Sequence, residues 1–177
     1  MPLQIAQTER LRIRWFEPGD CAFILELVNE PSWIRYIGNR GVNTLEDATG
    51  YIRKGPMQAY ERLGFGLYLV ELKQTGESIG MCGLIKREAL QDVDLGFAFL
   101  PQFRHRGYAF ESAAAVMSYA RDVVKLPRIV AILSKDNDRS LHLLGKLGFR
   151  FERTIRLQPD DEEIELHASA LGVRNRP

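Results

Sequence analysis

One continuous segment, from Val93 to Val124, constrains the fold of this chain more than any other. Residues 93–99 form a strand-like run, and small and apolar residues then recur at helical spacing from Gly107 onward. A second β-rich run, residues 128–133, follows the helix at once. Two strands joined through a helix make a crossover, so we predict that these strands are parallel neighbours in one sheet. The expected buried stripe of the helix comprises Phe110, Ala113, Ala114, Met117, Ala120 and Val124.

The loop between this strand and helix has the sequence Arg104-His105-Arg106-Gly107-Tyr108-Ala109. The start of a helix presents free backbone N–H groups at the positive end of its dipole, where phosphate oxygens bind. Gly107 lets the backbone approach such a group closely, and the three basic side chains before it add positive charge. The loop therefore predicts a phosphate-binding turn, and the alternative is an ordinary helix start with solvated basic residues. Neither a Walker loop nor a GxGxxG turn is present, which argues against a nucleotide-binding protein of those classes.

The rest of the pattern predicts an α+β fold around one mixed, seven-stranded sheet. Residues 31–42 are expected to form a loop, and Gly55-Pro56 to kink or split the second helix. Thr44, with Asp47 three residues on, is expected to cap that helix. The predicted strands are 11–16, 65–72, 78–85, 93–99, 128–133, 149–157 and 164–171, and the predicted helices are 20–28, 44–62, 107–124 and 137–147.

Composition excludes several classes of function. The chain has 177 residues, enough for one domain, with 24 basic and 23 acidic residues, so it is not built to cover nucleic acid or an anionic membrane. The two cysteines, Cys21 and Cys82, lie among apolar neighbours without metal-ligand spacing, and we expect buried thiols and no metal. The first ten residues lack the apolar core of a signal peptide, and no run approaches the ~20 apolar residues of a membrane span. We expect a cytoplasmic protein without nucleic-acid or membrane partners.

Two separated motifs, taken together, resemble the GNAT superfamily of N-acetyltransferases. The loop 104–109 matches the Gln/Arg-x-x-Gly-x-Gly/Ala signature of that family, and Glu111 after it fits as well. Residues 134–140 followed by Lys146-Leu147-Gly148-Phe149 look like its Asn-x-x-Ser and Lys-Leu-Gly-Phe segment. The opening residues 8–14 are similar to the RimJ/RimL-like branch, the ribosomal-protein N-terminal acetyltransferases. The resemblance covers the chain from about Thr8 to Leu171.

The resemblance implies a single acetyltransferase domain, residues 1–177 with a core at about 8–172. It implies a mostly antiparallel sheet with helices on both faces and a splayed parallel pair at the cofactor site. The implied reaction moves an acetyl group from acetyl-CoA to a primary amine, most often a protein N-terminus, by direct attack in a ternary complex. A small-molecule amine and a non-catalytic acyl-CoA sensor stay open as alternatives. The relatives are monomers or homodimers, and the sequence does not choose between them.

The resemblance also assigns cofactor-binding roles. The backbone of the strand at Phe97, Ala98 and Phe99 would pair with the pantetheine arm. Asn137 would hydrogen-bond the amide arm, and Ser140 would face the acetyl thioester. The pyrophosphate would be held by Arg104, His105, Arg106, Gly107, Tyr108 and Ala109.

Acetyl transfer also requires proton handling, because an amine must lose a proton and the leaving thiolate must gain one. Many relatives use a tyrosine as the acid at the position of Leu144, so Ser140 becomes the candidate acid here; an ordinary serine near a helix cap is the alternative. The candidate base is Asp94, against the alternative of a solvated carboxylate on a strand. Some relatives carry a glutamate where this chain has Ile132. Asp92, Glu71 and His167 are weaker candidates.

The amine-binding end is expected to involve Trp33, Arg35 and Tyr36, by resemblance to the loop that builds this pocket in the family. The alternative is that Trp33 and Tyr36 only cover the core. The acidic run 160–163 either attracts a cationic substrate or forms a solvated turn.

Overall fold

One mixed sheet of eight strands runs through the part of the chain that the computed structural model describes, residues 2–172. Met1 and residues 173–177 of the predicted domain lie outside this range. The strand order is β1-β2-β3-β4-β5-β6-β8-β7, and every neighbouring pair is antiparallel except β5 and β6. The strands are β1 (Gln4–Gln7), β2 (Leu11–Arg14), β3 (Leu67–Leu72), β4 (Ser78–Ile85), β5 (Asp94–Phe99), β6 (Arg128–Leu133), β7 (Arg150–Ile155) and β8 (Ile164–Ala170).

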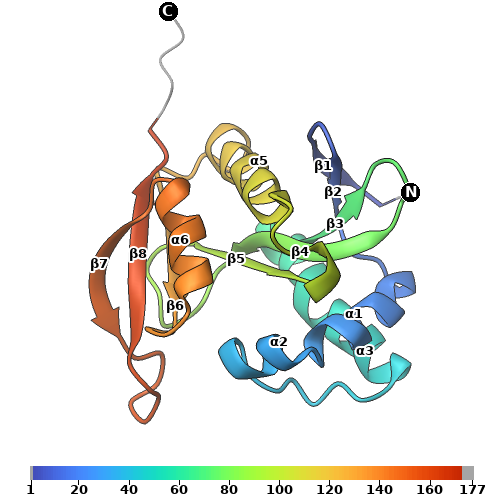
Figure 1. Cartoon of the computed structure of the whole chain (residues 1–177), viewed down its shortest axis with the longest axis horizontal. Helices are drawn as coiled ribbons and strands as arrows, with labels where there is room; N and C mark the ends of the chain where they lie inside the picture. The colour runs from blue at the N-terminus through green and yellow to red at the C-terminus, as the bar shows by residue number, and fades with distance from the viewer. Residues whose placement is uncertain (1, 173–177) are drawn as a thin grey trace, which may run out of the picture.

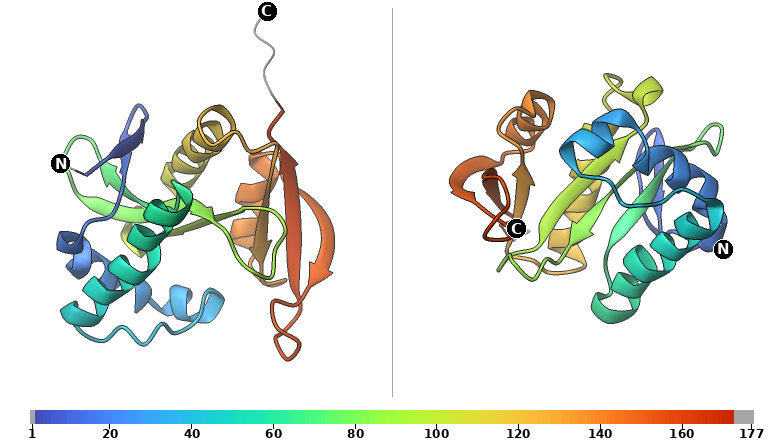
Figure 2. Two further views of the ribbon diagram at one scale, coloured as in Figure 1. Left: turned by 180° about the vertical axis from the view of Figure 1, so that it is seen from behind. Right: turned by 90° about the horizontal axis from the view of Figure 1, so that it is seen from below.

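Helices cover both faces of the sheet, as expected from the resemblance (Figures 1 and 2). The long helix α5 packs on one face against β4, β5 and the first strands, while α1, α3 and α4 lie on the opposite face. Helix α6 packs against β6. The helices are α1 (Cys21–Val28), α2 (Pro31–Tyr36), α3 (Leu45–Ile52), α4 (Gln58–Leu63), α5 (Tyr108–Asp122) and α6 (Asp138–Lys146).

The buried stripe of α5 differs from the predicted one. Ser112, Ala113, Val116 and Ala120 face the sheet, whereas Phe110 is 42% exposed. Small residues at these positions let the helix approach the sheet closely, and this close packing rotates the large Phe110 out of the core. The prediction of Phe110 as a core residue was therefore wrong.

Two local features depart from the sequence-based expectation, and the predicted break in the helix at Gly55-Pro56 is confirmed. The eighth strand is β1, whose turn into β2 is closed by a hydrogen bond from Thr8 N to Leu11 O of 2.9 Å. Residues 31–42 are not all loop, because the Glu30 carboxylate accepts from Ser32 N and Trp33 N and so caps α2. The helix around Gly55-Pro56 passes through a π turn, Arg53–Met57, that joins α3 to α4. The predicted cap at Thr44 is confirmed as a reciprocal pair with Asp47.

The parallel pair β5–β6 splits the sheet into two arms. It is held at one register pair, Asp94 with Val130, next to a 2.9 Å hydrogen bond from Val130 N to Val93 O. Strand β5 stays paired with β4 from Asp94 through Phe99, so β6 is the strand that leaves, together with β8 and β7. The predicted parallel, splayed pair is thus confirmed, and Figure 1 shows the two arms diverging.

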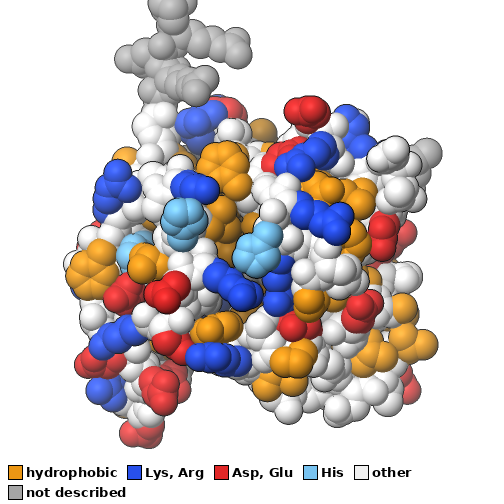
Figure 3. Space-filling view, viewed as in Figure 1, with side chains coloured by type: hydrophobic (Ala, Val, Ile, Leu, Met, Phe, Trp, Pro, Cys, Tyr) orange, Lys and Arg blue, Asp and Glu red, His pale blue; other side chains and the backbone are white. Residues whose placement is uncertain are grey.

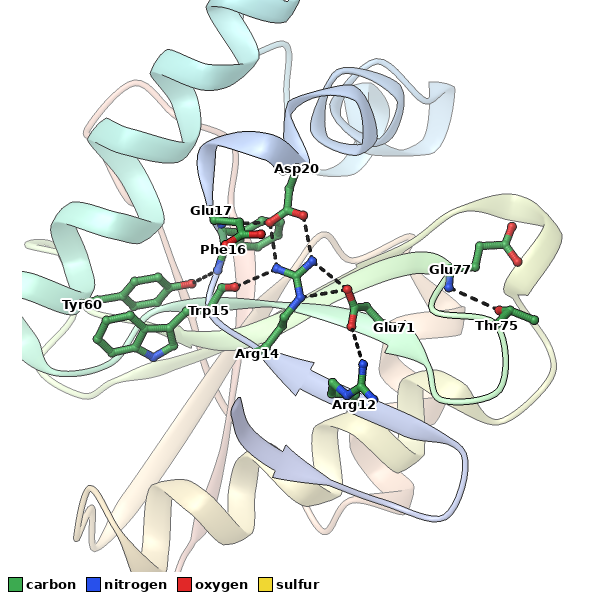
Figure 4. A network of polar contacts seen from close by, with 10 residues as sticks. All are labelled: Arg12, Arg14, Trp15, Phe16, Glu17, Asp20, Tyr60, Glu71, Thr75 and Glu77. Carbon is green, nitrogen blue, oxygen red and sulfur yellow. Dashed lines mark hydrogen bonds and ion pairs between the residues drawn. The ribbon is translucent and has the colours of Figure 1, made fainter. Parts of the chain in front are cut away.

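A buried ion network holds together the arm formed by β1 to β5, on the side away from the split (Figure 4). The Arg14 guanidinium on β2 donates to Glu71 on β3 at 2.8 Å and to both carboxylate oxygens of Asp20 at 2.8 and 2.9 Å. The ring of Tyr60 stacks on Trp15 at 4.3 Å, and its hydroxyl accepts from Phe16 N at 3.1 Å. These contacts tie α4 and the turn before α1 to β2 and β3, on the side of the sheet away from the split.

Candidate active site

A cavity of about 820 Å³ lies where the two arms separate. All six residues of β5 line it, together with the turn before α5, the start of α6 and the residues of α2 that face inward. Figure 3 shows basic and histidine side chains gathered in the middle of this face, between the two arms. Of the predicted site residues, only Arg35 and Arg106 do not line it. Those that do are Trp33, Tyr36, Asp94, Phe97, Ala98, Phe99, Arg104, His105, Gly107, Tyr108, Ala109, Asn137 and Ser140.

The edge of β5 that faces the cavity has backbone groups without a neighbouring strand. Val93 O points toward β6, and the two-residue repeat of a strand turns the carbonyls of Leu95 and Phe97 the same way. No register pair joins β5 to β6 beyond Asp94 in the described chain. Inward-facing N–H and C=O groups require partners, so this edge suits an extended chain with amide groups, such as the pantetheine arm.

The turn before α5 presents a row of free backbone N–H groups. None of the N–H groups of residues 105–110 donates a hydrogen bond within residues 2–172. His105 and Gly107 both adopt left-handed backbone conformations, with φ of 60° and 81°. Alternating conformations of this kind aim successive amides into a concave, anion-binding surface, which the dipole of a 15-residue helix reinforces.

Arg104 uses its guanidinium within the protein. Its Nε donates to Phe99 O at 2.9 Å, and its Nη2 contacts Glu30 and Ser32, each at 2.8 Å. Burial alone would raise the pKa of Glu30, but hydrogen bonds from Ser32 and Arg104 lower it. Arg104 therefore ties the start of α2 to the end of β5, and its backbone N–H donates to Pro101 O at 3.2 Å, so the free N–H groups of the turn begin at His105.

A clamp that sequence reasoning did not assign holds the turn from the other side. Glu111 accepts hydrogen bonds from Thr8 Oγ1 at 2.5 Å, from Arg10 N at 3.0 Å and from Arg10 Nε at 2.7 Å. Arg10 Nη1 donates to Arg106 O at 2.9 Å, and the guanidinium stacks over the Tyr108 ring. The Thr8-Glu9-Arg10 run and Glu111 were both recognised as motif residues, but only the folded chain joins them.

The start of α6 brings Asn137 and Ser140 to the cavity. Asn137 Oδ1 accepts from Ser140 N at 3.2 Å, which caps the helix. The Asn137 amide nitrogen and the Ser140 hydroxyl make no hydrogen bond within the described part of the chain, so both are available to a ligand. Leu144, at the position of the tyrosine in many relatives, is buried in the core.

Asp94 lies at the apex of the split, paired on one side with Ile85 and on the other with Val130. The residue is only 1% exposed, so the alternative of a solvated surface carboxylate is wrong. Arg87 Nε donates to Asp94 Oδ2 at 2.5 Å. Burial raises the pKa of Asp94 to about 6, against the opposing effect of Arg87. A carboxyl with a pKa near the working pH suits general base catalysis.

The weaker base candidates lie outside the cavity lining. Asp92 pairs with Arg128 at 2.9 Å, and Glu71 belongs to the buried network around Arg14. His167 contacts Glu165 at 2.8 Å and packs against the ring of Phe151 on β7.

At the opposite wall, Trp33 and Tyr36 line the cavity. Trp33 is also 4% exposed and belongs to the core, so it covers the core as well as lining the cavity. Arg35 points elsewhere: it pairs with Asp136 at 2.8 Å, which joins α2 to the loop before α6. Within residues 2–172, no three His, Cys, Asp or Glu side chains are grouped to hold a metal ion. No helix in that range is long and apolar enough to cross a membrane.

Comparison with known proteins identifies relatives by sequence. The profile of the Acetyltransferase (GNAT) domain matches residues 10–150. The uncharacterised N-acetyltransferase YnaD of Bacillus subtilis is 30% identical over 145 residues, which cover 82% of each chain. Spermidine N(1)-acetyltransferase of Escherichia coli K12 is 24% identical over 143 residues, which cover 80% of this chain and 74% of that one.

Solved structures share the fold over almost the whole length. An acetyltransferase of the GNAT family from Bacillus anthracis is 26% identical and has a TM-score of 0.77 over 93% of this chain and 97% of that one. RimL, a ribosomal L7/L12 α-N-protein acetyltransferase in complex with coenzyme A, is 18% identical, with a TM-score of 0.80 over 95% and 98%. The chain therefore belongs to the GNAT family and is an N-acetyltransferase.

Proposed function

We propose that this enzyme transfers the acetyl group of acetyl-CoA to the amine of a protein or peptide N-terminus, within one ternary complex. One observation carries the proposal: an open strand edge, a row of free N–H groups and a buried carboxylate share a single cavity. The open strand edge matches the extended diamide arm of the cofactor, and the row of N–H groups matches the pyrophosphate at the end of that arm. The third lies at the apex of the split.

The residues present fit acetyl-CoA. The N–H groups of the turn, from His105 to Ala109, would bind the pyrophosphate, with the Arg106 side chain reaching it from outside the cavity. The β5 edge at Phe97, Ala98 and Phe99 and the Asn137 amide would hold the pantetheine arm. The bound cofactor supplies an activated acetyl thioester.

Two side chains would handle protons. Asp94 would accept a proton from the attacking amine, directly or through a water molecule, since its pKa of about 6 leaves it ionised at neutral pH. The Ser140 hydroxyl, one helical turn after Asn137, would donate a proton to the leaving sulfur. The proton that Asp94 takes from the amine would return to Ser140 through solvent, so that both side chains recover their starting protonation states after each turnover.

The peptide acceptor rests on the similarity of the opening residues 8–14 to the RimJ/RimL-like branch. Trp33 and Tyr36, and the Arg35–Asp136 pair above them, form the side where such an acceptor would enter. Two alternatives remain: a small-molecule amine as acceptor, in keeping with the spermidine enzyme among the relatives, and an acyl-CoA-binding sensor without turnover.

Release of free CoA thiol, followed across a panel of N-terminal peptides and small amines, tests this proposal. Peptide-dependent release with a higher kcat/KM than any small amine supports it. Release only with small amines would favour the first alternative, and tight acetyl-CoA binding with no release would favour the sensor. Absence of acetyl-CoA binding would refute the placement of the cofactor.

Substitution Ser140→Ala tests the acid. We expect kcat to fall by about tenfold to a hundredfold while the Kd for acetyl-CoA changes less than threefold, because the hydroxyl acts on the leaving group. Ser118→Ala, on the exposed side of α5, is the matched control. An equal loss in kcat and in affinity would assign Ser140 to binding instead.

A further inference from the structure

Positively charged side chains outnumber negatively charged ones around the cavity. Five Lys or Arg side chains line the cavity against two carboxylates, Glu30 and Asp94. Both carboxylates are already paired, with Arg104 and Arg87 respectively. No unpaired carboxylate therefore lines the cavity within residues 2–172, whereas an acceptor with several ammonium groups would need one for each.

Three side chains that line the cavity have hydrogen-bond donors without a partner among residues 2–172. The Arg40 guanidinium, on the loop after α2, has no hydrogen bond or ion pair within the described chain. Arg87 uses only Nε, toward Asp94, which leaves its two terminal nitrogens free. The Tyr51 hydroxyl on α3 likewise has no partner among residues 2–172.

All three side chains line the same cavity, and Arg40 and Arg87 both lie within electrostatic range of Tyr51. The charges of Arg40 and Arg87 both act on Tyr51: they lower the pKa of its hydroxyl, although burial, the larger effect, raises it overall. Arg87 in turn contacts Asp94 at 2.5 Å, so its terminal nitrogens lie within a few ångströms of the candidate base. Strand β5 separates this cluster from the phosphate turn, because Asp94 begins the strand and Phe99 ends it.

We propose that Arg40, Arg87 and Tyr51 bind an anionic group on the acceptor, so the preferred substrate is an amine with a carboxylate only a few bonds away. The inference rests on the proposed acetyl transfer and narrows its acceptor. An amine delivered to Asp94 places a neighbouring carboxylate against the free guanidinium nitrogens, where bidentate, charge-assisted hydrogen bonds form. A free α-amino acid and a peptide with an acidic first residue share this chemistry.

The acidic hairpin between β7 and β8 does not change this assignment. Residues 160–163 lie outside the cavity lining, and Glu163 pairs with Lys135 at 3.0 Å and with Arg156 at 3.6 Å. The run is therefore a solvated turn, as one of the two sequence interpretations held, and it supplies no carboxylate to the acceptor.

Matched acceptors test the inference directly. We would compare alanine with alanine amide, and a peptide that begins with Asp with one that begins with Asn, with spermidine as the cationic probe. Rates are expressed per unprotonated amine. We expect kcat/KM to be at least tenfold higher for the anionic member of one pair. A preference for alanine over alanine amide would identify a free amino acid as the acceptor, and a preference for the Asp peptide over the Asn peptide would identify an acidic N-terminus. Equal or higher rates for the neutral members or for spermidine would overturn the inference. No thiol release with any amine would instead refute acetyl transfer.

The variant Arg40→Gln isolates the anion contact, since Arg87 also holds Asp94. We expect KM for the anionic acceptor to rise at least tenfold, KM for its neutral partner to change less than twofold, and Arg40→Lys to recover part of the loss. Arg53→Gln, an exposed arginine outside the cavity, is the control and should change neither. An equal effect of Arg40→Gln on both acceptors would overturn the assignment.

Discussion

At the scale of single residues, Asp94 shows how burial changes the chemistry of a side chain. The same carboxylate on an exposed strand would titrate near pH 4 and be a weak base. Flanked by Ile85 and Val130, it is removed from water, and Arg87 offsets only part of the cost of its charge. The result is a group that is ionised at neutral pH and still has appreciable proton affinity.

The pH dependence of the reaction follows from this. If Asp94 is the base, it must be deprotonated, so log(kcat/KM), expressed per unprotonated amine, should fall with a slope of one as the pH drops below about 6 and level off above it. Asp94→Asn should lower kcat by about a hundredfold or more and remove this limb of the profile. Stopped or continuous thiol-release assays from pH 5 to pH 8 measure both. A limb that persists in the variant would assign the titration to another group.

Gly107 is the second residue whose identity is set by its geometry. At φ of 81° any side chain is strained, and a Cβ would lie 3.2 Å from Arg10 Nη2, in the clamp that holds the phosphate turn. We expect Gly107→Ala to weaken acetyl-CoA binding by at least tenfold, and Gly107→Glu to abolish it through charge repulsion.

The control for this prediction is Gly76→Ala, in the turn between β3 and β4. Gly76 has a similar φ of 73° with open space around it. The two alanine variants therefore share the backbone strain, but only Gly107→Ala places a methyl group against the clamp around Arg10. Calorimetric titration should show an unchanged Kd for Gly76→Ala. If Gly107→Glu binds acetyl-CoA with the affinity of the parent chain, the phosphate turn is placed wrongly.

At the scale of elements, each part of the site is fixed by a neighbour far away in sequence. Arg104 joins β5 to α2 through Glu30, and Glu111 joins α5 to the turn between β1 and β2. Away from the site, Arg14 joins β2 to β3 and to the turn before α1 (Figure 4). Each link uses an arginine and a carboxylate. Arg14 holds both carboxylate oxygens of Asp20, which fixes orientation as well as distance, whereas Arg104 contacts Glu30 through Nη2 alone.

The network around Arg14 gives a prediction for stability. Arg14→Met should lower the free energy of unfolding by ~3–5 kcal/mol, since it leaves Asp20 and Glu71 buried without their cation. Arg12→Met is the control: Arg12 contacts Glu71 at 3.6 Å and its side chain is 43% exposed, so the expected change is at most ~1 kcal/mol. Urea denaturation followed by circular dichroism measures both. Similar small losses would show that the network is not a major source of stability.

At the scale of the whole molecule, the two arms meet at one register pair of β5 and β6 and diverge beyond it (Figure 2). The opening is lined by both arms, with β5 and the turn 104–110 on one side and the start of α6 on the other. A ligand that bridges the opening supplies the hydrogen bonds that a continuous sheet would otherwise make.

Binding of acetyl-CoA should therefore stabilise the entire fold. At a concentration one hundred times Kd, linkage predicts about 2.7 kcal/mol of added stability, which raises Tm by several degrees. Thermal unfolding at increasing acetyl-CoA concentration measures this, and hydrogen exchange should slow at the β5 edge and at the start of α6. AMP, which lacks the pantetheine arm, is the control. Equal shifts with both ligands would mean that the arm is not held between the strands.

The sequence by itself determined the local features, because each depends on residues close together in the chain. It was sufficient for the crossover through α5, the cap at Thr44 and the class of fold. It was not sufficient for β1, for α2 or for the rotation of Phe110 out of the core. These depend on pairing and packing with distant elements, which leave no periodic signal.

The tertiary structure alone decided the chemistry of the site. It buried Asp94 and placed Arg87 on it, turned the guanidinium of Arg104 toward Glu30, and left Arg40 free beside Tyr51. Proton affinity and charge complementarity depend on the distance to other charges and to water, and the contacts at the site join residues up to 103 positions apart in the sequence. The residue types were readable in the chain, but which of them are free to meet a substrate is set only when the arms come together.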